Sequence, residues 1–154
     1  MPHRAVRHCP AVVIRKAQAD DVEALVPLFA EWGHPQPAAA IAVQLAEWRA
    51  TPRGEVLVAE IDETVAGLVA VVAVPHLARP GRFARLGGLV VSADHRRRGV
   101  GRALMEAAER RARGWGCDRL ELTSSRSRTE AHAFYPALGY DEQSERQARY
   151  RREL

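Results

Sequence analysis

The stretch HRRRGVGRAL, residues 95–104, decides the fold, because three arginines lead into two closely spaced glycines just where an apolar helical pattern begins. Gly99 and Gly101 let the backbone N–H groups approach a ligand that a Cβ would obstruct. The apolar positions that follow at helical spacing are Val100, Ala103, Leu104, Ala107 and Ala108. The glycines therefore lie at a helix N-terminus, where unpaired N–H groups and the helix dipole attract anions. The bland alternative is a solvated basic helix start.

Two well-known phosphate loops do not fit this stretch. A dinucleotide fingerprint requires a third glycine three residues after Gly101, where the chain has Leu104. A nucleoside-triphosphate loop requires Gly-Lys-Ser/Thr, and the only lysine is Lys16. The sequence therefore indicates an anion loop of another kind, between an apolar strand over 86–91 and a helix.

The strand and loop together resemble the acetyl-CoA signature of the GNAT family of N-acetyltransferases. The resemblance is carried by the Leu-Val-Val run that ends at Val91 and by the Arg-x-x-Gly-x-Gly pattern that starts at Arg96. It implies that the loop amides bind the pyrophosphate of acetyl-CoA and that the strand holds the pantetheine arm. The residues assigned in this way are Leu89, Val90, Val91, Arg96, Arg97, Arg98, Gly99, Val100, Gly101 and Arg102.

A second motif near the C-terminus strengthens the resemblance. The stretch AHAFYPALGY, residues 131–140, is similar to the family pattern A-x-x-F-Y-x-x-L-G-F/Y. On a helix, Arg128, His132 and Tyr135 fall within roughly 60° of one another, so that one stripe presents polar groups while its neighbour packs. The resemblance implies that Tyr135 is the catalytic residue, which protonates the departing thiolate. A buried tyrosine whose hydroxyl only satisfies a backbone partner is the alternative.

The resemblance implies an α/β (α+β) fold of the GNAT type, a mixed, mostly antiparallel central sheet flanked by about four helices, and the order of the other segments agrees with it. We expect strands over 12–15, 55–61, 64–74, 82–92 and around Leu120, and one or two edge strands in the tail over 140–154. Helices are expected over 20–31, through Ile41 to Trp48, over 101–113 and over 128–138. An Asp20/Glu23 capping box is predicted to start the first helix. Residues 1–11 are predicted to be a flexible tail and 12–154 one acetyltransferase domain.

The predicted reaction is direct attack of a primary amine on the acetyl carbonyl, so neither Cys9 nor Cys117 is a candidate nucleophile. A phenol is protonated at neutral pH and can donate to sulfur as charge develops. The acceptor base stays open among Glu121, Asp94, His76 and His132. Many relatives carry a glutamate on the strand before the loop, where this chain has a Gly-Gly pair at 87–88.

Several side chains outside the two motifs are weaker candidates. Trp32 and His34 lie between two expected helices and are candidates for substrate contact, as are His76 and Glu121, although a packed Trp32 and an exposed His34 are the simpler interpretation. Arg128 stands where many relatives have asparagine, and it is expected either to bind a cofactor phosphate or to hold the loop over 124–127. His132 is expected to contact the cofactor or anchor the same loop.

Composition limits the remaining classes of function. The chain has 154 residues, 47% of them hydrophobic, and 23 basic against 19 acidic side chains, which suits one globular domain with an anionic ligand. Two isolated cysteines give no disulfide framework or zinc site, so a cytoplasmic protein without metal is expected. No run approaches about 18 apolar residues, so no membrane span is expected. Aromatic residues make up only 6%, so nucleic acid is not favoured as a partner.

The leading prediction is therefore an enzyme, an acetyl-CoA-dependent N-acetyltransferase that acts on a small-molecule amine. The alternatives are an acyl-CoA-binding sensor without catalysis, or an acetyltransferase for protein N-termini or lysine side chains, because the fold does not fix the substrate. Edge strands at the C-terminus would permit a homodimer.

Overall fold

The computed structural model describes residues 10–154, which form two compact parts, one ending at Leu122 and the other comprising Thr123–Leu154. The predicted N-terminal tail lies mostly outside the described residues, as does Cys9.

The first part is built on a five-stranded sheet in which the strands follow one another in chain order. The strands are β1 (Val13–Lys16), β2 (Gly54–Ile61), β3 (Thr64–Pro75), β4 (Arg82–Val91) and β5 (Cys117–Glu121). The pairs β1–β2, β2–β3 and β3–β4 are antiparallel, whereas β4 and β5 are parallel. Asp62 and Glu63, at the β2–β3 turn, both have positive φ, as a tight hairpin with right-handed twist requires. The predicted mixed, mostly antiparallel sheet is confirmed.

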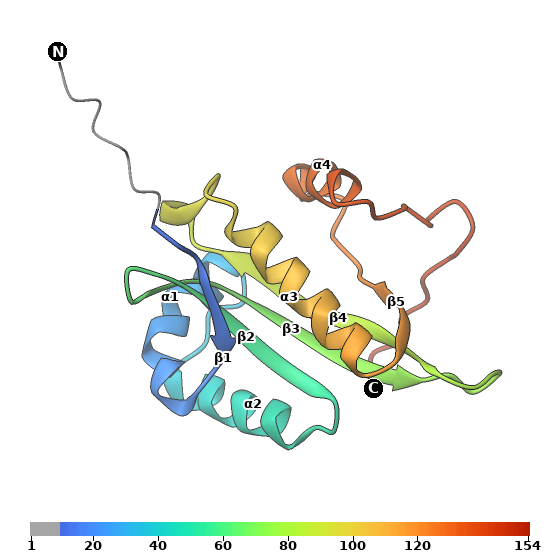
Figure 1. Ribbon diagram of the computed structural model, residues 1–154, viewed down its shortest axis with the longest axis horizontal. Helices are drawn as coiled ribbons and strands as arrows, with labels where there is room; N and C mark the ends of the chain where they lie inside the picture. Colours follow the sequence, from blue (N-terminus) through green and yellow to red (C-terminus); the bar gives the residue numbers. More distant parts are fainter. Residues whose placement is uncertain (1–9) are drawn as a thin grey trace, which may run out of the picture. The chain divides into compact units, whose positions relative to one another are not determined.

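Helices cover both faces of this sheet (Figure 1). The helices α1 (Val22–Trp32) and α2 (Ala38–Ala50) lie on one face, and α3 (Val100–Gly114) lies on the other. Strand alternation explains the division, because Val58 and Leu68 face α1 and α2 while Leu57 and Val69 face α3. Two separate cores result, one on each side of the sheet.

The start of α1 differs from the prediction. Asp21, not Asp20, is the anchoring carboxylate, and it accepts the backbone N–H of Gln18 at 2.7 Å. Asp21 is 6% exposed and receives two hydrogen bonds of 2.7 Å from the guanidinium of Arg15 on β1. The Asp20/Glu23 capping box was therefore wrong, because the local spacing could not reveal an arginine that comes from a strand.

A bulge interrupts β4 at Gly87. Ala70 of β3 pairs with Gly88 and its neighbour Val71 pairs with Leu86, so Gly87 is the extra residue. On the α3 face lie Leu86 before the bulge and Leu89 after it. Gly87 and Gly88 consequently both point toward α1 and α2.

The second part contains one helix, α4 (Thr129–Ala137), followed by a chain without strands among its described residues. The expected edge strands over 140–154 are therefore wrong. This tail is almost entirely exposed and rich in charged side chains, so it lacks the alternating apolar positions that would stabilise a strand against a core. The argument for a homodimer through these strands is lost with them.

Candidate functional site

The loop before α3 presents its backbone as an anion site. Gly99 precedes α3 with φ 76° and Arg97 also has a positive φ, 64°. Ala103 donates to the Gly99 carbonyl at 3.0 Å, and among the described residues no hydrogen bond is donated by the backbone N–H groups of Gly99 and Val100. No acidic residue occupies the first turn of α3, while Arg96, Arg97 and Arg98 are exposed beside it. The free amides, the helix dipole and the arginines together suit a phosphate group.

His95 adds a second sign of an absent polar ligand in the same loop. Its Nδ1 atom is buried and has no hydrogen-bond partner among the described residues. The loop is tied to α1, because Glu31 Oε2 accepts the N–H of Ala93 at 3.2 Å. An anion bound here would therefore lie close to the end of α1.

One edge of β4 is open next to this loop. The pairing with β5 runs only from Arg82 to Arg85, so within the described residues no strand pairs with that edge over residues 86–91. Ser92 donates its N–H to Ala66, and the Val90 carbonyl lies against Gly67, so both face β3. Because backbone groups alternate along a strand, those of Leu89 and Val91 point the other way, toward the open edge. An extended ligand with amide groups can add to the sheet there.

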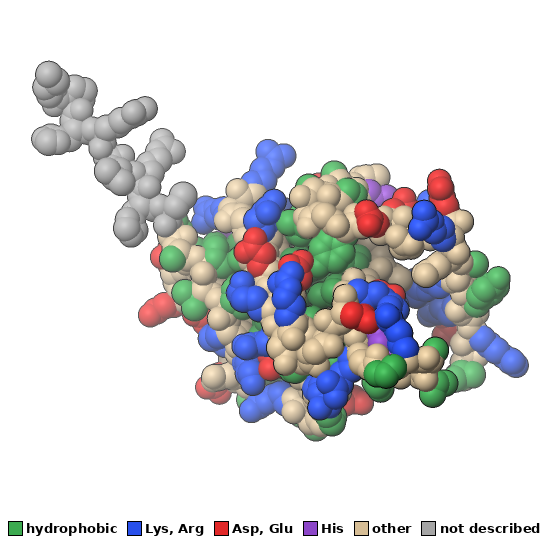
Figure 2. Space-filling view, turned by 45° about the vertical axis from the view of Figure 1, so that its right-hand side comes forward, with side chains coloured by type: hydrophobic (Ala, Val, Ile, Leu, Met, Phe, Trp, Pro, Cys, Tyr) green, Lys and Arg blue, Asp and Glu red, His purple; other side chains and the backbone are tan. Residues whose placement is uncertain are grey.

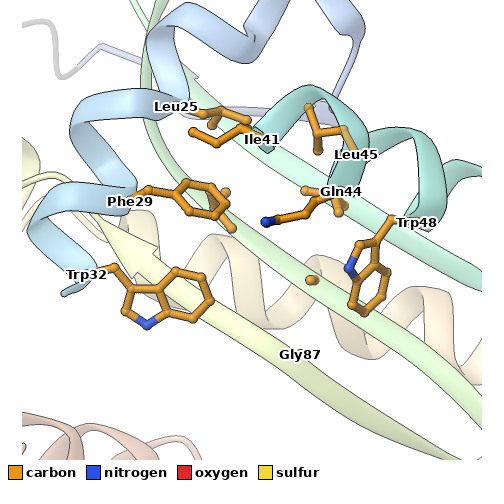
Figure 3. Close-up of a pocket in the computed structure, with 11 residues that line it drawn as sticks. Leu25, Phe29, Trp32, Ile41, Gln44, Leu45, Trp48 and Gly87 are labelled. Atoms are coloured by element: carbon orange, nitrogen blue, oxygen red, sulfur yellow. The ribbon is translucent and has the colours of Figure 1, made fainter. Parts of the chain in front are cut away.

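Two tryptophans occupy the space above the glycine pair. A Cβ on Gly87 would lie 2.8 Å from the Trp48 ring, and a Cβ on Gly88 would lie 2.2 Å from the Trp32 ring. Any side chain at these positions would collide with an indole, which explains why the strand carries no glutamate. The indoles flank Gly87 from α1 and α2, and all three residues line a cavity of about 120 Å³ (Figure 3).

The cavity is almost entirely apolar. Its walls include Phe29 of α1, Ile41 and Leu45 of α2, and Leu68 of β3. Gln44 is the single polar side chain among the lining residues, and its Nε2 donates to Gln36 Oε1. None of the lining residues carries a charge. The space adjoining the β4 bulge therefore suits hydrocarbon and not an ion.

In the second part, Tyr135 lies on α4 among other aromatic rings. Its ring centroid is 5.1 Å from Phe134 and 6.0 Å from Tyr140, both edge to face. Burial raises the pKa of Tyr135, and the positive charge of Arg128 opposes part of that rise. The hydroxyl is therefore held in its protonated form throughout the neutral range, as a proton donor must be.

The family model for the acetyltransferase (GNAT) family matches residues 20–140 of this sequence. The chain belongs to the GNAT acetyltransferase family. It is accordingly an acetyl-CoA-dependent N-acetyltransferase, and the predicted family, fold and type of enzyme are confirmed.

Solved structures agree with the fold of this acetyltransferase. A transcriptional regulator from Bacillus halodurans is 24% identical with a TM-score of 0.82, covering 94% of this chain and 100% of its own. A ribosomal-protein-alanine N-acetyltransferase from Brucella melitensis is 22% identical with a TM-score of 0.78, covering 94% and 99%. A glucosamine-6-phosphate N-acetyltransferase from Arabidopsis thaliana is 19% identical with a TM-score of 0.76, covering 91% and 98%. A comparison with curated proteins finds no match. These likenesses show the shared fold, and their different names leave the acceptor open.

The geometry of the acetyltransferase fits acetyl-CoA. The amides of residues 97–100 and the neighbouring arginines are suited to a diphosphate, and the free amide edge at Leu89 and Val91 is suited to the two amides of pantetheine. Basic side chains alternate with acidic ones on the face shown in Figure 2, without a continuous basic strip of the kind that nucleic acid favours. In the described part of the chain, no three metal-ligating side chains are grouped to hold an ion, and no helix has the length and apolar character to span a membrane.

On α4 of the acetyltransferase, His132 is arranged as a loop anchor. Its Nε2 lies 3.2 Å from the Ser125 carbonyl, and the Arg128 backbone N–H donates to the same carbonyl at 3.0 Å. Ser125 and Ser127 also share a hydrogen bond of 2.8 Å. This contact supports the anchoring role expected for His132, and its contact with the cofactor stays a prediction.

The remaining candidates are distributed along the first part of the acetyltransferase. Trp32 packs edge to face on Phe29 and on the exposed His34, so both lie at the cavity end of α1. Glu121 accepts a hydrogen bond from Arg119 at 2.8 Å, and Asp94 is exposed in the short turn after β4.

His76 is the candidate that the structure separates from the anion loop. It lies in the turn before β4, whose ten residues span about 30 Å to the loop at the other end. Its Nε2 is 2.9 Å from Asp118, which Arg79 also contacts at 2.6 Å. This histidine therefore belongs to a polar cluster at the far end of the strand.

Cys117 is unsuited to nucleophilic attack, because burial raises the pKa of its thiol. Sequence reasoning missed Trp48 and Gln44 as site residues. The adjacent glycines at 87–88 were the available signal, since paired glycines in a strand mark a close approach by something bulky.

Proposed function

We propose that this acetyltransferase transfers the acetyl group of acetyl-CoA to a small primary amine by direct attack, with Tyr135 as the general acid. The observation that supports this most is the open edge of β4, which runs from the bulge at Gly87 to the anion loop. A donor extended along this edge, with its diphosphate at the loop, would bring its thioester to the bulge. Gly87, the bulge residue, also lines the apolar cavity.

The reaction needs three events. The amine nitrogen, in its neutral form, attacks the thioester carbonyl carbon, while a backbone N–H of the open edge stabilises the developing oxyanion. The carbon–sulfur bond then breaks, and the Tyr135 hydroxyl gives its proton to the departing thiolate. The proton lost by the attacking nitrogen restores the tyrosine by way of solvent. No acidic or basic side chain lines the cavity, so the amine must arrive already deprotonated.

A panel of acceptors tests this proposal. Thiol release from acetyl-CoA is measured with small primary amines, with peptides that carry a free N-terminus, and with peptides that carry lysine. We expect release with small amines, and an intact protein mass that is unchanged after incubation with acetyl-CoA alone. Acetyl-CoA binding without thiol release with any acceptor would instead identify a sensor. Faster turnover of the peptides would identify a protein acetyltransferase.

A further inference from the structure

We propose that the acceptor of this acetyltransferase carries a small apolar group, which fills the cavity between α1, α2 and the β4 bulge. This inference rests on the proposed function and adds the class of amine. The acceptor would be a branched aliphatic or small-ring amine of about five carbon atoms, since an apolar protein cavity of about 150 Å³ holds one benzene.

Because none of its lining residues is charged, the cavity selects against polar acceptors. The volume is about 120 Å³, and Gln44 is the single polar side chain in its lining. A second ammonium group placed there would lose its hydration without gaining a carboxylate partner, which is costly. Diamines, polyamines and amino sugars are therefore poor acceptors. Each methylene of an apolar amine that enters the cavity improves binding by about fourfold.

The two tryptophans and the glycine pair determine how close the apolar group of the acceptor can come to the backbone of β4. Because the bulge turns both Gly87 and Gly88 toward α1 and α2, the Trp48 and Trp32 rings reach the backbone of β4 directly. The floor of the cavity is thus the peptide backbone next to the open edge. An amine whose hydrocarbon lies between the indoles would bring its nitrogen to that backbone.

The donor's own acyl group does not account for the cavity. The methyl of an acetyl group is far smaller than about 120 Å³. The walls come from α1 and α2 on one face, whereas the pantetheine arm would follow the edge of β4. The acceptor is therefore assigned to the cavity.

The test compares two amines of equal carbon number, 3-methylbutylamine and 1,5-diaminopentane, with ethylamine as the short reference. We expect kcat/KM for 3-methylbutylamine to exceed that for either of the others by about tenfold or more. Equal values for 3-methylbutylamine and 1,5-diaminopentane would overturn the inference while leaving acetyl transfer itself intact.

Two variants locate the effect. Ala70→Val adds two methyl groups to the cavity and is expected to lower the ratio of kcat/KM for 3-methylbutylamine to kcat/KM for ethylamine about tenfold. Ala73→Val is the control, because it makes the same change on the same strand outside the lining residues. Trp48→Leu enlarges the cavity and is expected to shift the preference to hexylamine, a gain that misfolding cannot produce. If all three variants alter every amine alike, the inference is wrong.

Two further measurements separate this inference from related failures. A change of selectivity in Ala70→Val between acetyl-CoA and 3-methylbutanoyl-CoA, with unchanged amine preference, would assign the cavity to the donor and overturn the inference. If no amine releases thiol, the proposed catalysis fails, and calorimetry with 3-methylbutylamine in the presence of CoA then decides. Binding that Ala70→Val weakens and Ala73→Val does not would support the cavity as an amine site. No detectable binding would refute it.

Discussion

Tyr135 is the single residue on which the proposed chemistry depends most. Its hydroxyl is kept protonated because burial raises its pKa above the ordinary value of 10. A proton donor with this property stays protonated through the neutral and mildly alkaline range. The activity should therefore rise with pH as the amine loses its proton, and it should fall only when Tyr135 ionises.

Tyr135→Phe removes this proton while keeping the ring. We expect kcat to fall by about 10² or more, since general acids typically contribute 10²–10⁴. The alkaline fall in activity, above pH 10 in the native protein, should disappear in the variant. Phe134→Leu is the matched control, because it disturbs the same aromatic cluster without removing a hydroxyl. Unchanged kcat and an unchanged alkaline limb in Tyr135→Phe would exclude the acid role.

Asp21 is the only buried charged residue in the described part of the chain, and its ion pair with Arg15 contributes to stability. Asp21→Asn removes the buried carboxylate to which Arg15 donates two hydrogen bonds, although Arg15 keeps its hydrogen bond to Glu60 at 2.8 Å. We expect a loss of about 2 kcal/mol in the free energy of unfolding at pH 7, measured by urea denaturation. Glu153→Gln, which breaks the exposed pair with Arg151, should change it by less than about 0.5 kcal/mol.

The pH dependence of this difference follows from the direction of the pKa shift. Hydrogen bonds from Arg15 hold the pKa of Asp21 below its usual range in the folded chain. The stabilisation is therefore complete above the ordinary carboxyl pKa of about 4, and it is lost as the pH falls through the lower, folded value. A difference between native protein and Asp21→Asn that stays constant down to pH 2 would contradict this account.

Among the elements, β4 organises the site because its bulge turns two consecutive glycines to one face. Gly88→Ala places a Cβ 2.2 Å from the Trp32 ring, so the indole must move. We expect a loss of about 2 kcal/mol in the free energy of unfolding, as for other overpacked sites. Adding Trp32→Leu to Gly88→Ala should remove most of this penalty, which a double-mutant cycle measures.

Gly114→Ala provides the control for that cycle. No atom lies within 4 Å of the Cβ it would add at the end of α3, so it should stabilise the protein by about 0.5 kcal/mol. Additive effects of Gly88→Ala and Trp32→Leu would mean that the indole does not occupy the space above Gly88.

The elements that periodicity defines were predictable, and those that depend on distant partners were not. The β2–β3 hairpin, α1, α2 and α3 follow from strand alternation, helical spacing and turn residues, and each was found close to its expected bounds. The Arg15–Asp21 pair joins a strand to the start of a helix. The local spacing of Asp20 and Glu23 therefore led to a capping box that the structure does not contain. The tail over 140–154 offered only weak alternation, which was too little to form strands.

The candidate site was predictable in its loop but not in its cavity. Gly99 and the arginines predicted an anion site because the residues that would form it are adjacent in the sequence. The cavity joins Phe29, Trp48 and Gly87, which lie on three different elements, and no spacing rule connects them. The glycine pair at 87–88 indicated a close approach to the strand, but only the structure shows that the Trp48 and Trp32 rings make it.

In the protein as a whole, we propose that acetyl-CoA follows one continuous path. This path runs along the open edge of β4 and ends at the amides before α3. Backbone N–H groups supply much of the binding there, so their exchange with solvent reports the ligand directly.

Hydrogen–deuterium exchange with and without acetyl-CoA tests this path most directly, because it needs no acceptor and no substitution. We expect acetyl-CoA binding to slow the exchange of backbone amides at residues 86–91 and 97–102, with little change over β1 and α2. Protection confined to other segments, such as the arginine-rich tail over 146–152, with unchanged exchange along β4 and the loop, would contradict it.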